Sequence, residues 1–300
     1  MTLRVLDPGL HTLVVDFGRP QYRSLGVPVG GAADRRSLAL GNALLGNPPD
    51  AAALEITLKG PRLRADGDVG CVLFGAPFEA TCGGYPIAMG STFVMKAGDE
   101  LRIGGAANGA RVYLSVVGGF DVPLILASRS ALEPIAKGQT LGCVASTTRR
   151  RSCPDAAWSF AVCVRVVPGL QASWFDDAEF YRQSFAVTAA SNRMGLRLTG
   201  QPLTMPQREM TSEPVCPGAV QATPDGQCIV LGVDGQTIGG YPKIAQVIQA
   251  DLDTLGQLRP GQLIEFKKVT LQQAIELDRQ AAADIREWTM RLRLAAEAVG

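Results

Sequence analysis

The sequence predicts a mainly β protein with some α, arranged as two β-rich lobes followed by a long C-terminal helix. Short apolar runs alternate with turn signals along most of the chain, and its 34 glycines and 19 prolines supply the turns that many short strands require. From residue 270 onward the apolar positions follow a helical period instead. With 46% hydrophobic residues among 300, the chain can bury a sizeable core.

The first half of the chain carries the clearest strand signals. Four apolar runs bounded by Gly, Asp or Pro are predicted as strands: Cys71–Phe74, Thr92–Met95, Leu101–Ile103 and Arg111–Val117. One segment differs, because Asp34 to Leu45 has helical spacing. We expect Asp34 to be its N-cap and Gly46-Asn47 to end it.

The second half repeats this alternation. Residues 144–158 are polar and turn-rich and form the predicted boundary between the lobes. Further strands are predicted at Ser159–Val167, Phe185–Ala189, Cys228–Val233 and Leu263–Phe266. Ile244 to Leu255 fits either a helix or a strand followed by a helical turn.

A long amphipathic helix is predicted at the C-terminus, with Thr270 as its N-cap. Its apolar face is predicted to comprise Leu271, Ile275, Ala282, Ile285, Trp288, Leu292 and Val299. Glu287 and Arg291 form a supporting i,i+4 pair, and we interpret Trp288 as core packing. The expected domains are therefore 1–150, 151–269 and 270–300.

Composition excludes several classes of partner. The net charge is +1 and Arg149–Arg151 is the only basic run, so nucleic acid is not expected. No apolar run approaches the ~20 residues that span a membrane. The N-terminus has no signal-peptide pattern, and we expect a cytoplasmic protein.

Ligands for a metal are scarce. Seven cysteines without a CxxC pair and a single histidine, His11, do not supply a zinc cluster or a Ser-His-Asp triad. We interpret Cys71, Cys163 and Cys228, which lie in apolar runs, as small core residues. No metal site is expected.

The segment Val230–Pro242 is the strongest candidate for a binding site. A hydrophobic strand runs into Asp234 and Gln236 and then breaks at Gly239-Gly240, directly before Tyr241. Strand ends fix side chains in place, and glycines permit close approach of a ligand or of another backbone. The same residues also fit an ordinary glycine-rich hairpin turn.

Two further candidates combine arginines with glycine-rich loops. Arg19 and Asp34 flank loops whose backbone N–H groups could cradle an anion, although N-capping accounts for Asp34 by itself. Ser128-Arg129-Ser130 sets a guanidinium beside two hydroxyls, which suits a bidentate grip on a carboxylate or phosphate. The same arginine could instead satisfy loop carbonyls. No GxxxxGKS or GxxxxGKT loop is present, so a complete P-loop ATP site is absent.

A last group of charged residues lies in the second half. Arg193 and Arg197 could bind an acidic ligand or the acidic face of another subunit. Glu213, directly before a proline, could act as a general base when partly desolvated, or could neutralise Arg193 or Arg197. No nucleophile with its base is evident, which indicates a site shared with another chain.

These segments together make a specific pattern. Its members are Gly18–Pro20, Gly26–Pro28, Gly30–Asp34, Gly46-Asn47, Ala53–Thr57, Gly118-Gly119, Ser128–Ser130, Asn192-Arg193, Gly195, Arg197, Ser212-Glu213, Gly218, Gln221, Asp234–Pro242, Pro260-Gly261 and Phe266. With them the chain resembles the biotin-dependent carboxyltransferase-like family, also called allophanate-hydrolase-subunit-2-like. Its bacterial members include the C component of 5-oxoprolinase, of the Kip antagonist type.

The resemblance implies a cyclophilin-like β-barrel architecture and a working unit made with two partners, the B component of 5-oxoprolinase (Kip-inhibitor type) and the A component. In the oxoprolinase members, the three components together use ATP to open the lactam of 5-oxoproline to L-glutamate. By position, the resemblance implies catalytic roles for Asp234, Glu213 and Tyr241. It implies substrate binding by Gln236, Arg193, Arg129, Arg197 and Arg19, and no metal.

The leading expectation is therefore the C component of an ATP-dependent 5-oxoprolinase, inactive alone and acting on a small cyclic or linear amide. One alternative is the carboxyltransferase component of a biotin-dependent urea or amide carboxylase. Another is a non-enzymatic regulator that binds a Kip-type kinase inhibitor. Two departures from the family give the regulator some weight: Ala131–Gly138 is short and lacks the usual glycines, and Ala127 stands where glycine is usual. The C-terminal helix also looks longer than the family requires.

Overall fold

The computed structural model describes residues 1–153 and 163–297, and the side chains of the last helix only to residue 295. The chain divides into two compact units. Unit 1 comprises 1–18, 34–159 and 284–300, and unit 2 comprises 19–33 and 160–283. The predicted domains 1–150, 151–269 and 270–300 stay a prediction, and each unit is described by itself.

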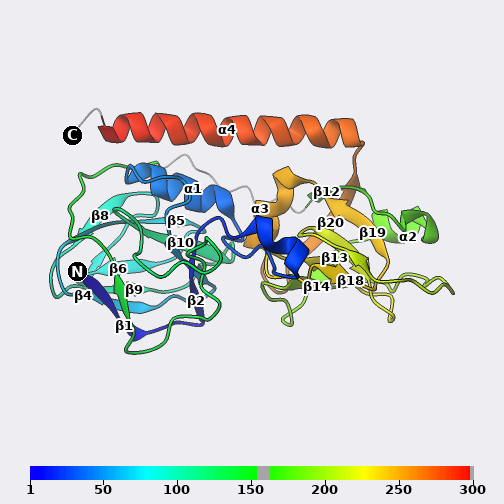
Figure 1. Cartoon of the computed structure of the whole chain (residues 1–300), viewed down its shortest axis with the longest axis horizontal. Coiled ribbons are helices and arrows are strands. Elements are labelled where there is room, and N and C mark those ends of the chain that lie inside the picture. The colour runs from blue at the N-terminus through cyan, green and yellow to red at the C-terminus, as the bar shows by residue number, and fades with distance from the viewer. Residues whose placement is uncertain (154–162, 298–300) are drawn as a thin grey trace. The chain divides into compact units, whose positions relative to one another are not determined.

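Unit 1 contains two antiparallel sheets (Figure 1). The first has the order β11 (Thr140–Gly142), β1 (Thr2–Asp7), β4 (Arg62–Ala65), β9 (Glu100–Ile103), β6 (Ala80–Cys82) and β7 (Tyr85–Pro86). The second has the order β2 (His11–Val15), β3 (Ala53–Thr57), β10 (Arg111–Val116), β5 (Val69–Gly75) and β8 (Thr92–Met95). Strands of both sheets contribute to one hydrophobic core, so they pack face to face.

Side chains of successive residues along a strand point to opposite faces of the sheet. In β5, Cys71 and Leu73 enter the core between the sheets, while Val72 and Phe74 point the other way. The second sheet is therefore buried on both sides, and α1 (Arg35–Leu44) covers its outer face (Figure 1). The predicted helix and its N-cap are confirmed, because the Asp34 carboxylate accepts a hydrogen bond from the backbone N–H of Ser37.

Unit 2 is a closed barrel of seven strands. Their order is β12 (Cys163–Pro168), β19 (Lys243–Val247), β16 (Ala219–Ala222), β17 (Cys228–Leu231), β14 (Gly195–Thr199), β13 (Phe185–Val187) and β20 (Leu263–Lys268). Parallel pairing of β12 with β20 closes it. The expected mainly β class with a barrel is confirmed.

Shorter elements complete unit 2. A two-stranded ribbon pairs β15 (Glu213–Pro214) with β18 (Ile238–Gly239). The remaining elements are η1 (Pro20–Leu25), η2 (Ala172–Trp174), α2 (Asp177–Tyr181), η3 (Gln249–Asp251) and α3 (Leu252–Gln257). The segment Ile244–Leu255 is thus a strand followed by helical turns, the second of its two predicted alternatives.

The start of β12 bears on two predictions, one for the strand and one for Cys163. The strand expected at Ser159–Val167 begins in 154–162, which lies outside the described residues, and β12 starts at Cys163. The prediction that Cys163 is a core residue is wrong, since alternation along β12 turns it outward and buries Val164 instead. Cys71 and Cys228 are fully buried, as predicted.

The long C-terminal helix is α4 (Leu271–Glu297). Its N-terminus is capped as predicted, because the Thr270 hydroxyl accepts from the backbone N–H of Gln273, whose amide oxygen accepts from the N–H of Thr270. Glu287 and Arg291 form the predicted pair, at 2.5 Å.

The predicted apolar face of α4 is partly wrong. Leu271, Ile275 and Ala282 are exposed, while Ala274 is buried. A helical period fits neighbouring faces equally well, so the period by itself did not identify the packed one. Trp288 and Leu292 do pack against the α1 side of the unit 1 core, as expected, and Val299 lies outside the described residues. No helix in the described part of the chain is both long and apolar enough to cross a membrane.

Candidate functional site

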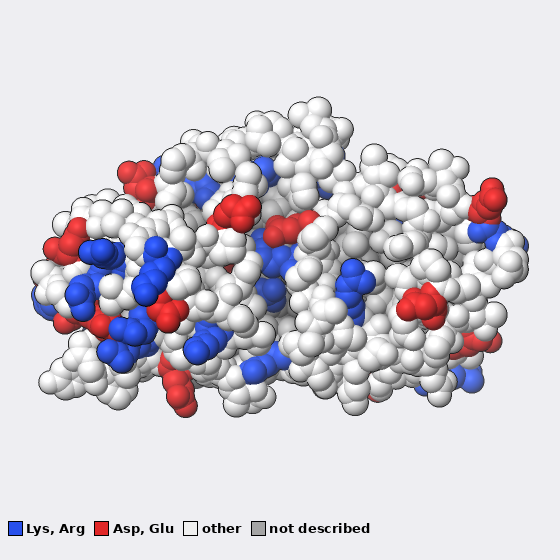
Figure 2. All heavy atoms as spheres, turned by 90° about the horizontal axis from the view of Figure 1, so that it is seen from below, with Lys and Arg blue, Asp and Glu red and all other residues white. Residues whose placement is uncertain are grey.

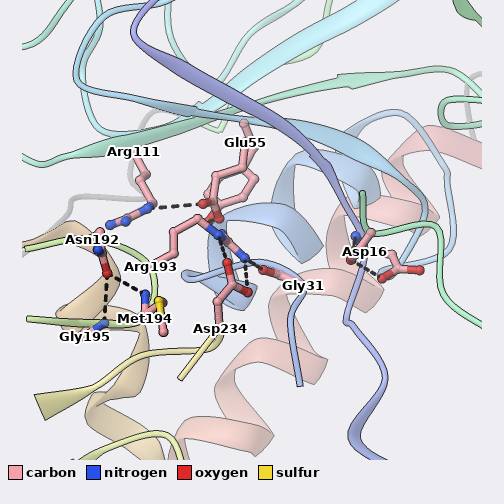
Figure 3. Close-up of polar contacts among 11 residues, drawn as sticks. Asp16, Gly31, Glu55, Arg111, Asn192, Arg193, Met194, Gly195 and Asp234 are labelled. Carbon is pink, nitrogen blue, oxygen red and sulfur yellow. Dashed lines mark hydrogen bonds and ion pairs between the residues drawn. The ribbon is translucent and has the colours of Figure 1, made fainter. Parts of the chain in front are cut away.

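Arg193 and Asp234 form a forked ion pair in unit 2 (Figure 3). The Nε atom of Arg193 lies 2.7 Å from one Asp234 oxygen and its Nη2 atom lies 3.0 Å from the other. Nη2 also donates to the carbonyl of Gly31, at 2.7 Å. The arginine side chain is 8% exposed and that of Asp234 34%. The arginine is thereby held in one orientation while the carboxylate keeps an accessible side.

Glycines bring these two residues together. A Cβ at Gly232 would lie 2.2 Å from the carbonyl oxygen of Arg193, so only glycine permits this approach. Gly30, at φ +64°, donates to the carbonyl of Val233. Arg19, which is buried, reaches the same point: its Nη1 atom would lie 3.4 Å from a Cβ at Gly30. The structure therefore places the predicted residues Arg19, Arg193 and Asp234 around one glycine loop.

Glu213 forms a second charged cluster in unit 2. Its carboxylate lies 2.6 Å from the Nζ atom of Lys243 and accepts from the amide of Gln171 at 3.3 Å. The prediction that Glu213 neutralises Arg193 or Arg197 is wrong, because β15 and β19 bring it to Lys243 instead. Lys243 and then Gln171 lower the pKa of Glu213, which stabilises the ionised form and weakens it as a base.

Two amides and a phenol lie beside the β15–β18 ribbon. A Cβ at Gly239 would lie 2.6 Å from Nε2 of Gln221 and 3.0 Å from Nε2 of Gln236. Gln221 is buried and donates to the carbonyl of Tyr241, at 3.4 Å, while the Tyr241 ring is 40% exposed. The ribbon thus brings Gln221, Gln236 and the backbone of Tyr241 together, while the roles expected of Gln236 and Tyr241 stay predictions. Arg197 is exposed on β14, where its side chain makes no hydrogen bond or ion pair within the described residues.

The Ser128–Ser130 segment in unit 1 is organised by Asp16. One oxygen of Asp16 accepts from both serine hydroxyls at 2.6 Å, and the other accepts from the backbone N–H of Arg129 at 2.6 Å. Burial raises the pKa of Asp16, but these bonds outweigh it and hold the pKa below its ordinary value. Both serine hydroxyls donate to this carboxylate, so a grip on a ligand by the Arg129 guanidinium stays a prediction. Nη1 of Arg129 donates to the carbonyl of Val122, which was the alternative interpretation.

A pocket of about 640 Å³ adjoins this segment. Its walls include the Gly118–Asp121 turn, Leu124, Ala127, Asp50 and Val144, together with Asp16 and Arg129. Three carboxylates face the Arg129 guanidinium, and Met1, whose ammonium donates to the carbonyl of Cys143, also lines the pocket. The charges nearly balance, so the pocket suits a neutral group with N–H donors better than a simple anion. The Asp16 acceptors are already used, which leaves Asp50 and Asp121 to accept from such a ligand.

Sequence reasoning missed a buried polar network in unit 1. Glu55, in the middle of β3, accepts from the Tyr113 hydroxyl at 2.7 Å and from Nε of Arg111 at 3.2 Å (Figure 3 shows Glu55 and Arg111). The hydroxyl of Tyr113 in turn accepts from the backbone N–H of Asp34, at 2.9 Å. A lone carboxylate inside an apolar strand was the signal that could have revealed it. In the described ranges, no three His, Cys, Asp or Glu side chains gather as metal ligands.

Comparison with known proteins assigns the family. Residues 25–268 match the family model described as "Carboxyltransferase domain, subdomain A and B". The chain belongs to this carboxyltransferase family. The resemblance seen in the sequence is thereby confirmed.

Two curated relatives match along nearly their whole length. The chain is 36% identical to the C component of 5-oxoprolinase from Escherichia coli K12, over 91% of this chain and 93% of the relative. It is 34% identical to the same component from Haemophilus influenzae, over 92% and 94%. It is also 28% identical to urea amidolyase of Lachancea kluyveri, but over only 18% of that larger protein.

Solved structures share the fold. The Kluyveromyces lactis urea amidolyase structure matches 96% of this chain, with a TM-score of 0.88 and 28% identity, over 20% of that protein. The crystal structure of TTHA0988 matches 89% of this chain with a TM-score of 0.82 and 35% identity. The chain spans about half the length of TTHA0988, at 55%.

Proposed function

We propose that this chain is the C component of an ATP-dependent 5-oxoprolinase, which opens 5-oxoproline to L-glutamate. The observation that carries the proposal is the identity of 36% and 34% to two such components, over 93% and 94% of their own length. The match to urea amidolyase has lower identity and covers 18% of that protein. Similarity along a whole component favours the oxoprolinase role over a part of a fused carboxylase.

The unit 1 pocket suits the lactam amide of this substrate, which has one N–H donor and one carbonyl acceptor. 5-Oxoproline also has a carboxylate that is ionised near neutral pH, so we propose that the pocket takes the amide end and that the carboxylate lies away from Asp16, Asp50 and Asp121. We propose that Arg129 donates to the carbonyl and that Asp50 or Asp121 accepts from the N–H. The bonds that Asp16 makes to the segment fix the backbone at Arg129, so the guanidinium is positioned before a ligand arrives.

In unit 2 we propose that Asp234, Glu213 and Tyr241 take part in catalysis and that Arg193, Gln236, Arg197 and Arg19 bind substrate. The forked pair with Arg193 supports this for Asp234, because two hydrogen bonds hold the carboxylate in one orientation. Glu213 is suited to electrostatic stabilisation more than to proton abstraction, since Lys243 lowers its pKa.

We propose that the chain works in a complex with the A and B components of the enzyme and is inactive alone, in the cytoplasm. Neither the Arg193–Asp234 pair nor the Glu213–Lys243 pair supplies a nucleophile with an adjacent base, which is the support for a shared reaction. The sequence holds no GxxxxGKS or GxxxxGKT loop, and we therefore place the ATP site on a partner protein.

A second candidate function is carboxyl transfer from biotin to urea or a similar amide. It is favoured by the match of 96% of this chain to urea amidolyase, with a TM-score of 0.88. The unit 1 pocket also suits urea, which is a neutral amide with N–H donors. Biotin would enter on a carrier from another chain, and the residues above would only orient the acceptor amide.

The test is reconstitution. The chain is purified together with A and B component proteins of 5-oxoprolinase, and ATP hydrolysis that depends on 5-oxoproline is measured together with glutamate. We expect turnover only when all three proteins are present. Turnover no higher than that of the two partner proteins alone would overturn the proposal. A parallel arm with a biotinylated carrier, bicarbonate, ATP and urea would then support carboxyl transfer if urea carboxylation appears.

A further inference from the structure

The outer face of the six-stranded sheet in unit 1 carries four arginines, Arg4, Arg62, Arg64 and Arg102, which we call the arginine face. In the strand register, Arg4 of β1 lies opposite Arg64 of β4, and Arg62 of β4 lies opposite Arg102 of β9. Each of these arginines is exposed, while its neighbours along the strand are buried apolar residues. Basic side chains gather on the lobe that holds this sheet (Figure 2).

The strand register pairs like charges twice and opposite charges twice on this face. Arg4–Arg64 and Arg62–Arg102 are destabilising pairs, whereas Asp7–Arg62 and Glu100–Arg64 are favourable ones. Only Glu100 and Asp7 oppose the four arginines on these strands, which leaves an excess of two positive charges. The net charge of the entire chain is +1. The positive charge is thus concentrated on this face, which indicates a role in binding.

Glu100 orients the arginines without neutralising them. Nε of Arg62 lies 2.7 Å and Nε of Arg102 2.9 Å from the same Glu100 oxygen, and Nη2 of Arg64 lies 3.9 Å from the other. Both short contacts use Nε. These contacts of Arg62 and Arg102 with Glu100 do not use the terminal Nη atoms, which leaves these donors for a further acceptor. The exposed fractions of the side chains are 46% for Arg62, 56% for Arg64 and 62% for Arg102.

We propose that the arginine face docks an acidic surface on a partner protein of the complex. Guanidinium groups bind carboxylates through two parallel hydrogen bonds, and groups already oriented lose less side-chain entropy on binding. Neighbouring strands are about 4.8 Å apart, so these side chains extend from adjacent points of one sheet face and can contact the same protein surface. This inference rests on the proposed function in one respect, namely that the partner proteins exist.

Other ligands fit less well. Proteins bind small anions in concave sites, whereas the arginine face is the open face of a sheet, so it is poorly suited to a small anion. Nucleic acid and anionic membranes require a larger basic excess than two charges. An acidic protein surface needs only local complementarity, which directs encounter and orientation.

The test measures binding and not turnover. Association of the full chain with the purified A and B component proteins is followed by surface plasmon resonance at low and high salt. One variant is Arg64→Gln/Arg102→Gln. Its matched control is Arg149→Gln/Arg150→Gln, which removes the same charge from unit 1 beside β8, where the Arg149 carbonyl accepts from Thr92.

We expect the Arg64→Gln/Arg102→Gln variant to associate about tenfold more slowly than the control at low salt, with the difference shrinking as salt rises. Glu100→Gln raises the positive excess but removes the group that orients the arginines, so we expect faster association at low salt together with faster dissociation. Equal rates for the two double variants, or no binding by the wild-type chain, would each overturn the proposal. Binding of the double variants to nucleic acid and to phosphatidylserine vesicles is measured in the same way. The proposal would also be overturned if Arg64→Gln/Arg102→Gln weakened binding to one of these and left binding to the partner proteins unchanged. A complex that forms but does not open 5-oxoproline overturns the proposed function alone.

Discussion

Replacing Tyr113 by phenylalanine removes one hydroxyl from the centre of the buried network in unit 1. That hydroxyl donates to the Glu55 carboxylate at 2.7 Å and accepts from the backbone N–H of Asp34 at 2.9 Å. Burial, and then the nearby Glu55, raise the pKa of Tyr113 well above its ordinary value, so the hydroxyl keeps its proton and remains a donor. The substitution leaves two buried polar groups each short of a partner.

The magnitude follows from the two bonds. A hydrogen bond to a charged group contributes about 1.5–3 kcal/mol, and one between neutral groups contributes about 0.5–1.5 kcal/mol. Glu55 has an ion pair with Arg111, so the first value applies to its bond with Tyr113. We therefore expect Tyr113→Phe to lower the free energy of unfolding of unit 1 by about 3 kcal/mol.

The assay is native-state hydrogen exchange of the β10 amides in increasing urea, which reports unit 1 separately from unit 2. The matched control is Tyr85→Phe, because Tyr85 lies exposed on β7 and its hydroxyl has no bond within the described residues. We expect the control to stay within about 0.5 kcal/mol of the wild type. An equally small change for Tyr113→Phe would refute the reasoning that this network stabilises unit 1.

Three other substitutions test the sites. The pKa of Asp16 is lower in the folded chain than its unfolded value of 3.8, so ionised Asp16 contributes to the free energy of unfolding. That contribution is complete above pH 3.8 and is lost as the pH falls through the folded pKa. Asp16→Asn should therefore reduce the fall of Tm with decreasing pH in this range, as measured by thermal unfolding at a series of pH values. Asp234→Ala removes the ion pair that orients Arg193 and should lower the turnover of the reconstituted complex about tenfold or more. The control Glu209→Ala, at an exposed residue, should leave turnover unchanged. Equal turnover of the two variants would mean that Asp234 has only a structural role. Lys243→Met should raise the pKa of Glu213 toward its ordinary 4.5 in an NMR titration, and an unmoved titration would contradict the assigned cause.

The local elements of this protein were accessible from the sequence because short-range physics specifies them. Asp34 caps α1 through a bond to a residue three positions away, and Thr270 caps α4 in the same manner. Alternation of apolar and polar residues placed the strands around Leu101 and Cys228. The Asp234–Tyr241 loop was identified by glycines that follow a strand, and the structure explains them through close backbone approaches.

Long-range pairing was decided only by the tertiary structure. Asp16 meets Ser128 across 112 positions and Tyr113 meets Glu55 across 58, and no local pattern encodes which strands become neighbours. The same reason accounts for the partner of Glu213, since strand order brought Lys243 to it in place of an arginine. Sequence therefore determined which segments are strands, helices and glycine loops in this protein. Sheet order and register, which depend on packing of the whole core, decided which charged side chains meet.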